Sequence, residues 1–311
     1  MHRTLFAKSG LSFDRLRVLV EVADAGSIAA AAGGDPVRQS QFSRQLKELE
    51  AFFECKLTEH KGRKLVMTTA GRQLADLARD QLNVLARFQA ESKQAPLLIR
   101  VGAGESLLQW LLIPGLCAIK TVEPPVYWRL ENRKTQEIVD RILDQRLDFG
   151  LLRNVEETPP LKWCRLGRLS SILCVPGKMA SGMSAKPAVA VSQLPMALLE
   201  GRSRFRQTIE ETCRKLHRIP NIRFECSSQP EIAVIVRNGL AAGILPGLSR
   251  REFTGCDVRI VDLGKVAAFN SELYLVWNPR TLDMSARIEA LRDDLASALR
   301  QAIAQQAAGN H

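Results

Sequence analysis

The side chains best suited to recognising another molecule lie between residues 39 and 47. This stretch carries amides, short hydroxyls, an arginine and a lysine: Gln39, Ser40, Gln41, Ser43, Arg44 and Lys47. Amides and hydroxyls bond the edges of bases, and an arginine fork matches guanine or a phosphate. On a helix the hydroxyls, the arginine and the lysine share one face, with the two glutamines beside it in the first turn. The pattern is typical of a helix that enters the major groove of DNA, and a solvated polar face is the alternative.

The opposite face of the same segment would hold this helix in place. Its apolar residues recur at spacings of four, three and four: Phe42, Leu46, Leu49 and Phe53. Two shorter helices are expected before it, the first capped by Ser12 and the second by Ser27, and residues 33–36 (Gly-Gly-Asp-Pro) predict a tight turn. This order of helix, small-residue helix, turn and polar-faced helix over 38–53 favours DNA recognition over the solvated face.

A basic turn follows the predicted recognition helix. Residues 61–64 read Lys-Gly-Arg-Lys and precede a short apolar stretch at 65–68. A two-stranded wing whose positive tip, with Arg63 and Lys64, contacts phosphates or a minor groove would explain this pattern. An ordinary basic hairpin is the alternative.

A long amphipathic helix is predicted over residues 70–94. Its apolar stripe includes Leu74, Leu77, Leu85 and Phe88. Its other side carries polar and charged residues: Arg72, Asp76, Arg79, Asp80, Asn83 and Arg87. A helix of this kind needs a partner for the apolar stripe, and we expect the same helix of a second subunit, because readers of DNA half-sites are usually two-fold dimers. Packing of the stripe on its own chain is the alternative.

Beyond Pro96 the chain alternates strands and helices, which predicts βαβ units around a largely parallel sheet. The expected strands are 97–101, 126–130, 149–152, 172–175, one near Val189, 197–199, 223–225, 243–245 and 273–277. The expected helices are 106–113, 135–145, 205–216, 231–238 and 285–303. The pattern changes after Asp148 and returns near Leu273, which indicates two lobes joined by two crossover strands. A cleft between such lobes is a natural ligand site.

Composition limits the other possibilities. The net charge of +11 is spread as +4 before Pro96 and +7 after it, so it supports an anionic partner only weakly. No apolar run reaches the ~18 residues needed to span a bilayer, and charged residues interrupt any signal-peptide core near the start, so a cytoplasmic protein with no membrane partner is expected.

Seven scattered cysteines and four histidines form no metal set, although Cys55 has two interpretations, a redox-active thiol or an ordinary packing residue. Without a catalytic motif, we expect no enzyme, no catalytic residue and no cofactor. The alternative function is a cytosolic small-molecule-binding protein or an enzyme without a DNA-binding role.

The N-terminal block resembles the LysR-type transcriptional regulators. The matching positions run without a gap from Gly26-Ser27-Ile28 through Ala31-Ala32, Gln39, Ser43-Arg44-Gln45-Leu46, Leu49-Glu50, Leu57, Arg63 and Thr68 to Ala70-Gly71. Further on, Asp148-Phe149-Gly150 and residues 239–246 match recurring phrases of the family. The chain departs from the family pattern at Ser40, Gln41, Thr58 and His60, and Asp35 stands where a core leucine is usual.

The resemblance implies a winged helix-turn-helix followed by a two-lobed effector domain similar to type 2 periplasmic binding proteins. The implied domains are 1–69 for DNA binding, 70–94 for the linker and dimerisation helix, and 97–311 for the effector, with lobe I at 97–172 and 270–311 and lobe II at 173–269. The implied partners are a double-stranded, pseudo-palindromic operator and a second copy of the chain, as a homodimer or a homotetramer.

The resemblance also points to loops at strand ends as the effector site. The expected residues are Gly104, Ser106, Thr135, Arg202, Ser203, Arg204, Phe205 and Ser227. Ser106, Thr135 and Ser203 stand at predicted helix starts, where free N–H groups favour an anion, and Arg202, Arg204 and Arg206 add cations. The expected effector is therefore a small anion. Simple capping explains the serine and threonine equally well, and a solvated loop explains the arginines.

Overall fold

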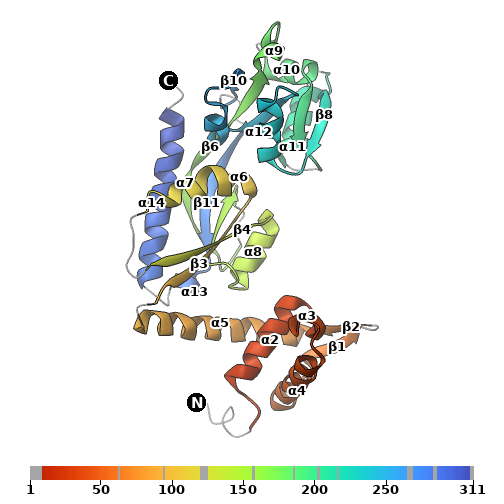
Figure 1. Ribbon diagram of the computed structural model, residues 1–311, viewed down its shortest axis with the longest axis vertical. Helices are drawn as coiled ribbons and strands as arrows, with labels where there is room; N and C mark the ends of the chain where they lie inside the picture. The colour runs from red at the N-terminus through yellow and green to blue at the C-terminus, as the bar shows by residue number, and fades with distance from the viewer. Residues whose placement is uncertain are drawn as a thin grey trace. The chain divides into compact units, whose positions relative to one another are not determined.

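The computed structural model describes residues 9–61, 64–93, 95–119, 125–155, 158–184, 186–201, 204–215, 217–264, 269–282 and 286–308. The chain divides into two compact units (Figure 1). Unit 1 comprises Met1–Leu97, Pro124–Tyr127 and Asp144–Arg146, and unit 2 comprises Leu98–Glu123, Trp128–Leu143 and Leu147–His311. No helix in the described part of the chain is long and apolar enough to cross a bilayer.

Unit 1 begins with three helices, α2 (Phe13–Ala25), α3 (Ile28–Ala31) and α4 (Pro36–Phe53). The hydroxyl of Ser12 accepts from the Arg15 N–H at 3.3 Å, and the hydroxyl of Ser27 accepts from the Ala30 N–H at 3.1 Å. Each therefore satisfies an N–H that has no partner within its own helix. Gly26 ends α2 with φ of 74°, a left-handed conformation that suits glycine.

The core of unit 1 lies where these three helices meet. Its most buried members come from α2 and α4: Val18, Leu19, Val22, Phe42, Leu46 and Leu49. Full burial of one such side chain is worth about 1.5–3 kcal/mol, so this contact holds α4 in place. The residues on α4 keep the predicted spacing of four and three, which is why only one of its faces is apolar.

A hairpin and a long helix complete unit 1. Strands β1 (Thr58–Lys61) and β2 (Lys64–Met67) pair antiparallel, and α5 (Thr69–Ser92) follows directly. Gly71 permits α5 to start so close to the hairpin, because a Cβ at this position would lie 2.1 Å from the carbonyl oxygen of Leu57.

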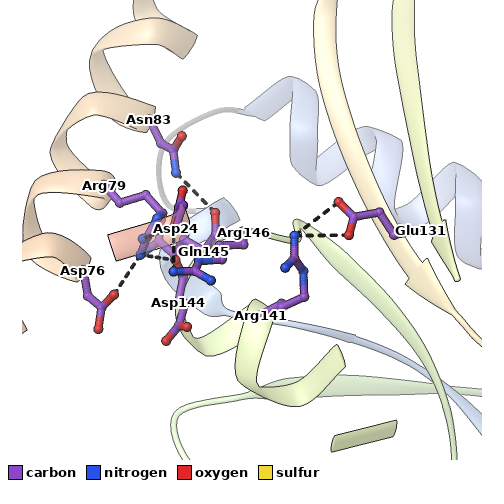
Figure 2. A network of polar contacts seen from close by, with 9 residues as sticks. All are labelled: Asp24, Asp76, Arg79, Asn83, Glu131, Arg141, Asp144, Gln145 and Arg146. Carbon is purple, nitrogen blue, oxygen red and sulfur yellow. Dashed lines mark hydrogen bonds and ion pairs between the residues drawn. The ribbon is translucent and has the colours of Figure 1, made fainter. Parts of the chain in front are cut away.

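Arg79 of α5 is the centre of a polar network in unit 1 (Figure 2). Its guanidinium contacts the carboxylates of Asp24 and Asp76, each at 2.7 Å, and donates to the carbonyl of Asp144 at 3.3 Å. Asp24 also pairs with Arg146. Arg79 is buried although its sequence pattern placed it on a solvated polar side, because a buried guanidinium is tolerated once carboxylates and carbonyls satisfy it.

Unit 2 is built on a mixed sheet with the order β4-β3-β5-β11-β6-β9-β7-β8, and β10 pairs with β6. The strands are β3 (Leu97–Ala103), β4 (Val126–Asn132), β5 (Phe149–Arg153), β6 (Lys162–Pro176), β7 (Met196–Leu199), β8 (Ile222–Cys226), β9 (Ala242–Pro246), β10 (Val258–Asp262) and β11 (Asn270–Trp277). The first half of β6 pairs with β11 and its second half pairs with β9 and β10. One long strand thus serves two lobes, in agreement with the predicted crossover.

Helices cover each part of the sheet. They are α6 (Glu105–Leu107), α7 (Ile113–Leu116), α8 (Thr135–Leu143), α9 (Gly177–Ala180), α10 (Pro187–Gln193), α11 (Arg204–Arg214), α12 (Gln229–Arg237), α13 (Pro279–Leu282) and α14 (Ala286–Ala308), with a π-helical segment at Leu108–Leu112 and a 3₁₀ helix at Gly247–Phe253. One core lies under α8 around Ile138, Ile142 and Leu152. A separate core around Met196, Leu198 and Ile209 supports the other lobe. These are the two lobes of a fold that resembles periplasmic binding proteins.

Several predictions about local structure were wrong. The segment near Val189 is helical in α10 and is not a strand, because Pro187 starts a helix whose Ala190 and Val191 enter a core. The single helix predicted over 106–113 is α6, a π-helical turn and α7 in succession. The predicted start of the last helix, Ser285, lies outside the described residues, and α14 runs to Ala308, beyond its predicted end at 303.

Candidate nucleic-acid interface and ligand cavity

The first turn of α4 is fixed by Asp35 and Pro36. The carboxylate of Asp35 accepts from the Val37 N–H at 2.8 Å, and Pro36 occupies the first helical position, where its missing N–H has no cost. Asp35 therefore acts as an exposed N-cap at the position where the family usually has a core leucine. The cap sets where α4 begins, and hence which residues form its first two turns.

The polar residues of α4 lie opposite its buried side chains. Ser40, Gln41, Arg44 and Lys47 are exposed, while Gln39 and Ser43 are half-buried. We call these six residues the recognition face. They offer amides, hydroxyls and two cations to a partner outside unit 1, as the sequence pattern predicted.

Arg44 is the cation best placed to make a base contact. Its side chain is 76% exposed, and its ion-pair partner is Glu48 one turn on, at 3.8 Å. Glu48 is also bound by Arg15 of α2, so that carboxylate is already neutralised. The Arg44 fork is therefore free to leave Glu48 and meet an acceptor on DNA, because an exposed pair of this kind contributes about 1 kcal/mol at most.

The hairpin stands where a wing was predicted, with Lys61 opposite Lys64 at its tip. Arg63, the expected wing contact, lies outside the described residues, and of Lys64 the structure describes the backbone only. Their contacts with DNA remain predictions.

Glu50 is a positioning residue to which the sequence analysis assigned no role. One carboxylate oxygen accepts from the backbone N–H groups of Leu57 and Thr58, at 2.9 and 3.0 Å, and Lys56 approaches the other at 3.5 Å. Burial alone would raise the pKa of Glu50, but these hydrogen bonds and the ammonium outweigh it and hold the pKa below its ordinary value of 4.5. The carboxylate thereby joins α4 to the start of the wing.

We expect Glu50→Gln to destabilise unit 1 by about 1 kcal/mol at pH 7, because the hydrogen bonds to a charged acceptor become bonds to a neutral one. A carboxyl whose pKa is lowered on folding stabilises the fold above its unfolded pKa and loses that effect as pH falls through the folded pKa. The difference in free energy of unfolding between the wild type and Glu50→Gln should therefore shrink as pH falls from 7 to below about 4.5. Urea unfolding across this range, with the exposed Glu59→Gln as control, measures it; a pH-independent difference would contradict the assignment.

The apolar stripe of α5 is only partly free. Leu77, Leu85 and Phe88 are exposed by 58%, 46% and 69%. Leu74 instead packs against the core of unit 1, so the prediction that it faces a second subunit is not supported by its surroundings. The other three residues leave an apolar surface that still needs a partner.

Unit 2 contains a cavity of about 730 Å³, large enough for a small organic molecule. Hydroxyls line both sides of it: Ser106 and Thr135 from lobe I, and Ser171, Thr208, Ser227 and Ser228 from β6 and lobe II. Ser228 caps α12, and its hydroxyl accepts from the Glu231 N–H at 3.4 Å. Leu151, Leu169 and Phe269 add apolar surface. The cavity therefore suits a ligand with both polar and apolar parts.

The structure brings together half of the expected effector residues. Gly104, Ser106, Thr135 and Ser227 line the cavity. Arg202 and Ser203 lie outside the described residues, and of Arg204 and Phe205 only the backbone, at the start of α11, is described. Arg206 does not serve a ligand: its buried guanidinium binds Glu210 at 2.6 Å and Glu225 at 3.2 Å.

Arg153 is a cavity residue that the sequence analysis missed. It ends β5, at the carboxyl end of a strand that runs parallel to β3, and its guanidinium donates to the Ser106 hydroxyl at 3.5 Å. Ligands of open α/β sheets bind outside the carboxyl ends of the strands, so the end of the predicted strand 149–152 was the signal that could have found it. By contrast, Asp148 just before β5 is buried and accepts from the Arg100 N–H at 2.7 Å, a structural role.

The described residues offer no metal site, and three of the seven cysteines are buried. No group of three or more His, Cys, Asp or Glu in the described part of the chain could hold a metal ion. Burial raises the pKa of Cys174 to about 12 and also raises the pKa of Cys213 and Cys226. Cys55 packs beside the core of unit 1.

Two family models match the chain in succession. Residues 13–72 match the bacterial regulatory helix-turn-helix protein model of the lysR family, and residues 93–300 match the LysR substrate binding domain. The second match alone covers more than half of the chain.

Similar proteins and structures agree with these models. A probable hydrogen peroxide-inducible genes activator from Mycobacterium leprae (strain TN) is 27% identical over 205 residues, 64% of this chain and 66% of that protein. The uncharacterised HTH-type transcriptional regulator YnfL from Escherichia coli (strain K12) is 25% identical over 92% of this chain and 98% of its own.

Among solved structures, full-length OxyR from Pseudomonas aeruginosa, a cysteine-to-aspartate variant, matches with a TM-score of 0.68 at 18% identity over 93% of this chain and 95% of its own. Full-length CbnR in complex with its target DNA matches with a TM-score of 0.58 at 19% identity over 94% and 100% of the two chains. At these identities the structures show a shared fold.

Proposed function

The chain belongs to the LysR family of bacterial transcriptional regulators, and we propose that it reads one operator sequence with the recognition face of α4 and changes that reading when a small molecule occupies the cavity of unit 2. The observation that carries the proposal is the division of α4 into a buried apolar face and an exposed face of hydroxyls, amides and cations. We propose 1–69 as the DNA-binding domain, 70–94 as the linker helix and 97–311 as the effector domain, with the lobe boundaries given by the sequence.

On DNA, α4 would lie in the major groove. Gln39, Ser43 and Arg44 would meet base edges, and Ser40, Gln41 and Lys47 would bond bases or phosphates beside them. Arg63 and Lys64 of the wing would contact the backbone or the minor groove. Glu50 supports this arrangement because it ties the end of α4 to the start of the wing.

The active form would be a homodimer, or a tetramer made of two dimers. Leu77, Leu85 and Phe88 present an exposed apolar stripe on α5, which a second copy of α5 would cover. A two-fold dimer places two copies of α4 on one side of the duplex, so the operator is expected to be pseudo-palindromic, with half-sites separated by whole helical turns of about 10 base pairs.

The effector would act by preferring one arrangement of the two lobes. Gly104, Ser106, Thr135 and Ser227 already line the cavity from both lobes, so a ligand that contacts both would favour the closed state. The ligand then changes the operator affinity, by at most the factor by which it binds one arrangement of the lobes more tightly than the other. Because the target is operator DNA, we place the protein in the cytoplasm.

Thiol-based sensing of peroxide is a second function to weigh, because the relative from Mycobacterium leprae is named as a probable hydrogen peroxide-inducible genes activator. Such sensing needs an accessible thiolate of low pKa. In this chain burial raises the pKa of Cys174, Cys213 and Cys226, which opposes thiolate formation at these positions. Cys117 is the exposed thiol among the seven, so oxidation would have to begin there or at a half-buried cysteine. We favour ligand binding because unit 2 contains a cavity that suits a ligand.

Selection from a pool of random duplexes tests the DNA-reading part of the proposal. The purified full chain should enrich one motif with two-fold symmetry. Enrichment of no motif, or of an asymmetric single site, would argue against the proposed dimeric reader.

Thr135→Val tests the effector part, because Thr135 is the first residue of α8 and lines the cavity. A library of small organic molecules is screened by thermal shift, since a ligand that binds the folded state raises its stability by mass action. For the hits, Thr135→Val should abolish the effect on operator affinity while leaving affinity without ligand unchanged. If both are lost together, Thr135 has a folding role.

A further inference from the structure

Arg153 is a half-buried arginine whose Nε is buried, and it lacks a carboxylate partner among the described residues. Five other arginines in the described part of the chain have a buried Nε without an acceptor: Arg79, Arg100, Arg141, Arg146 and Arg287. The first four pair with a carboxylate, for example Arg100 with Asp148 at 3.7 Å and Arg141 with Glu131 at 3.1 Å. For Arg153 the contact given is a neutral hydroxyl, that of Ser106, at 3.5 Å.

This arrangement leaves the charge of Arg153 poorly compensated. A charge partly withdrawn from water loses solvation that one long hydrogen bond to a hydroxyl does not replace. Burial accordingly lowers the pKa of Arg153 to about 10, which still leaves it charged at neutral pH. The position lines the cavity at the end of β5, so a ligand there would meet the cation directly.

We infer that Arg153 is the residue that selects the effector, and that the effectors are small organic monocarboxylates. This inference rests on the proposed function. A carboxylate neutralises one guanidinium and accepts two parallel hydrogen bonds from its fork. The Ser106 hydroxyl beside the fork can donate to the same group, and Leu151, Leu169 and Phe269 can contact an apolar remainder.

Charge balance favours a monoanion over phosphate or sulfate. Sulfate carries two negative charges at neutral pH, and phosphate carries between one and two. Lys134 and Arg133 also line the cavity, but both are exposed, and Arg133 pairs with Glu131 at 3.3 Å. Two further carboxylates, Glu105 and Glu137, line the cavity and oppose a second negative charge.

The test compares matched probes on the full chain. Sodium acetate, lactate and benzoate are measured against lactamide, benzamide, sodium phosphate and sodium sulfate, with sodium chloride keeping the ionic strength constant. We expect the carboxylates to raise the melting temperature and the amides and inorganic dianions not to. Arg153→Gln should weaken carboxylate binding by about tenfold or more, the loss expected for a charge-assisted fork.

The control variant is Arg129→Gln, which removes a cation from the exposed side of β4 and should behave like the wild type. Without ligand, Arg153→Gln should unfold at the same or a higher temperature than the wild type, because it removes a half-buried charge that has no carboxylate partner among the described residues. Should Arg153→Gln not fold, Arg153→Lys replaces it; this variant keeps the charge but loses the fork, and should bind carboxylates more weakly.

Three results would overturn the inference: no stabilisation of the wild type by any carboxylate, equal stabilisation of Arg153→Gln, or stronger stabilisation by phosphate or sulfate. None of these touches the DNA-reading proposal, which is tested separately by the selection from random duplexes. The two failures are therefore distinguishable.

Discussion

Replacing Arg44 with alanine is expected to weaken binding to the selected operator by about 1–3 kcal/mol, roughly five- to 150-fold, the range for losing a bidentate base contact. Arg44 is 76% exposed on the recognition face and is held in place by one weak contact with Glu48. Its removal should leave the fold intact, because the opposite face of α4 carries the packing. Titration of the operator duplex with the wild type and the variant measures the effect.

Two further variants separate base reading from general attraction to DNA. Lys47→Ala should weaken binding to all duplexes alike. It should also reduce by about one the slope of the logarithm of the binding constant against the logarithm of salt concentration, as expected for a phosphate contact. Arg17→Ala removes an exposed cation of α2 that pairs with Asp14 and Glu21, and should change little. If Arg44→Ala binds the operator as the wild type does, α4 does not read bases through this residue.

Replacing Phe88 with glutamate is expected to produce a monomer and to lower operator affinity by about 100-fold or more, because two linked half-site contacts become one. Phe88 is 69% exposed on α5, and with Leu77 and Leu85 it forms the stripe that we assign to the subunit interface. A charge in the middle of that surface would be buried without a partner in the dimer. Sedimentation equilibrium and operator titration measure the two effects.

The matched control is Ala86→Glu. Ala86 is exposed on the same helix, but two residues before Phe88 it points to the opposite side, because each residue turns the helix by about 100°. This variant should remain dimeric. A dimer with full operator affinity after Phe88→Glu would place the subunit interface elsewhere.

The features predicted correctly are those that neighbouring residues determine. Ser12 and Ser27 cap helices because an N-cap needs only its own hydroxyl and an N–H three residues on. The burial of Phe42, Leu46 and Leu49 follows from their spacing on one helix. The alternation of strands and helices after Pro96 indicated the two-lobed fold for the same reason.

The features that were missed depend on residues far apart in the chain. Nothing near Arg79 indicates that Asp24, 55 residues earlier, would neutralise it and permit its burial. Leu74 fits the apolar stripe of α5 by periodicity, yet it packs on the core of unit 1, which a helical pattern alone does not specify. A strand was predicted near Val189, but a helix begins at Pro187 and includes this residue.

The candidate cavity illustrates the same limit. Ser106 and Thr135 were implied by the family resemblance and also stand at predicted helix starts. For Arg153 the available signal was its place at the end of a predicted strand, which does not separate it from an exposed arginine. Its importance depends on the carboxylates that pair with four other arginines of buried Nε and are absent from its own described contacts.

The most direct test of the account is the ratio of affinities for the selected operator and for a scrambled duplex of the same length, measured at about 150 mM salt. A net charge of +11 gives any such protein some attraction to DNA, so binding alone decides nothing. Sequence reading by the recognition face predicts a preference of about 1,000-fold or more for the operator. Equal affinity for the two duplexes would show that the exposed face of α4 does not read sequence, and would contradict the assignment of this chain as an operator-specific regulator.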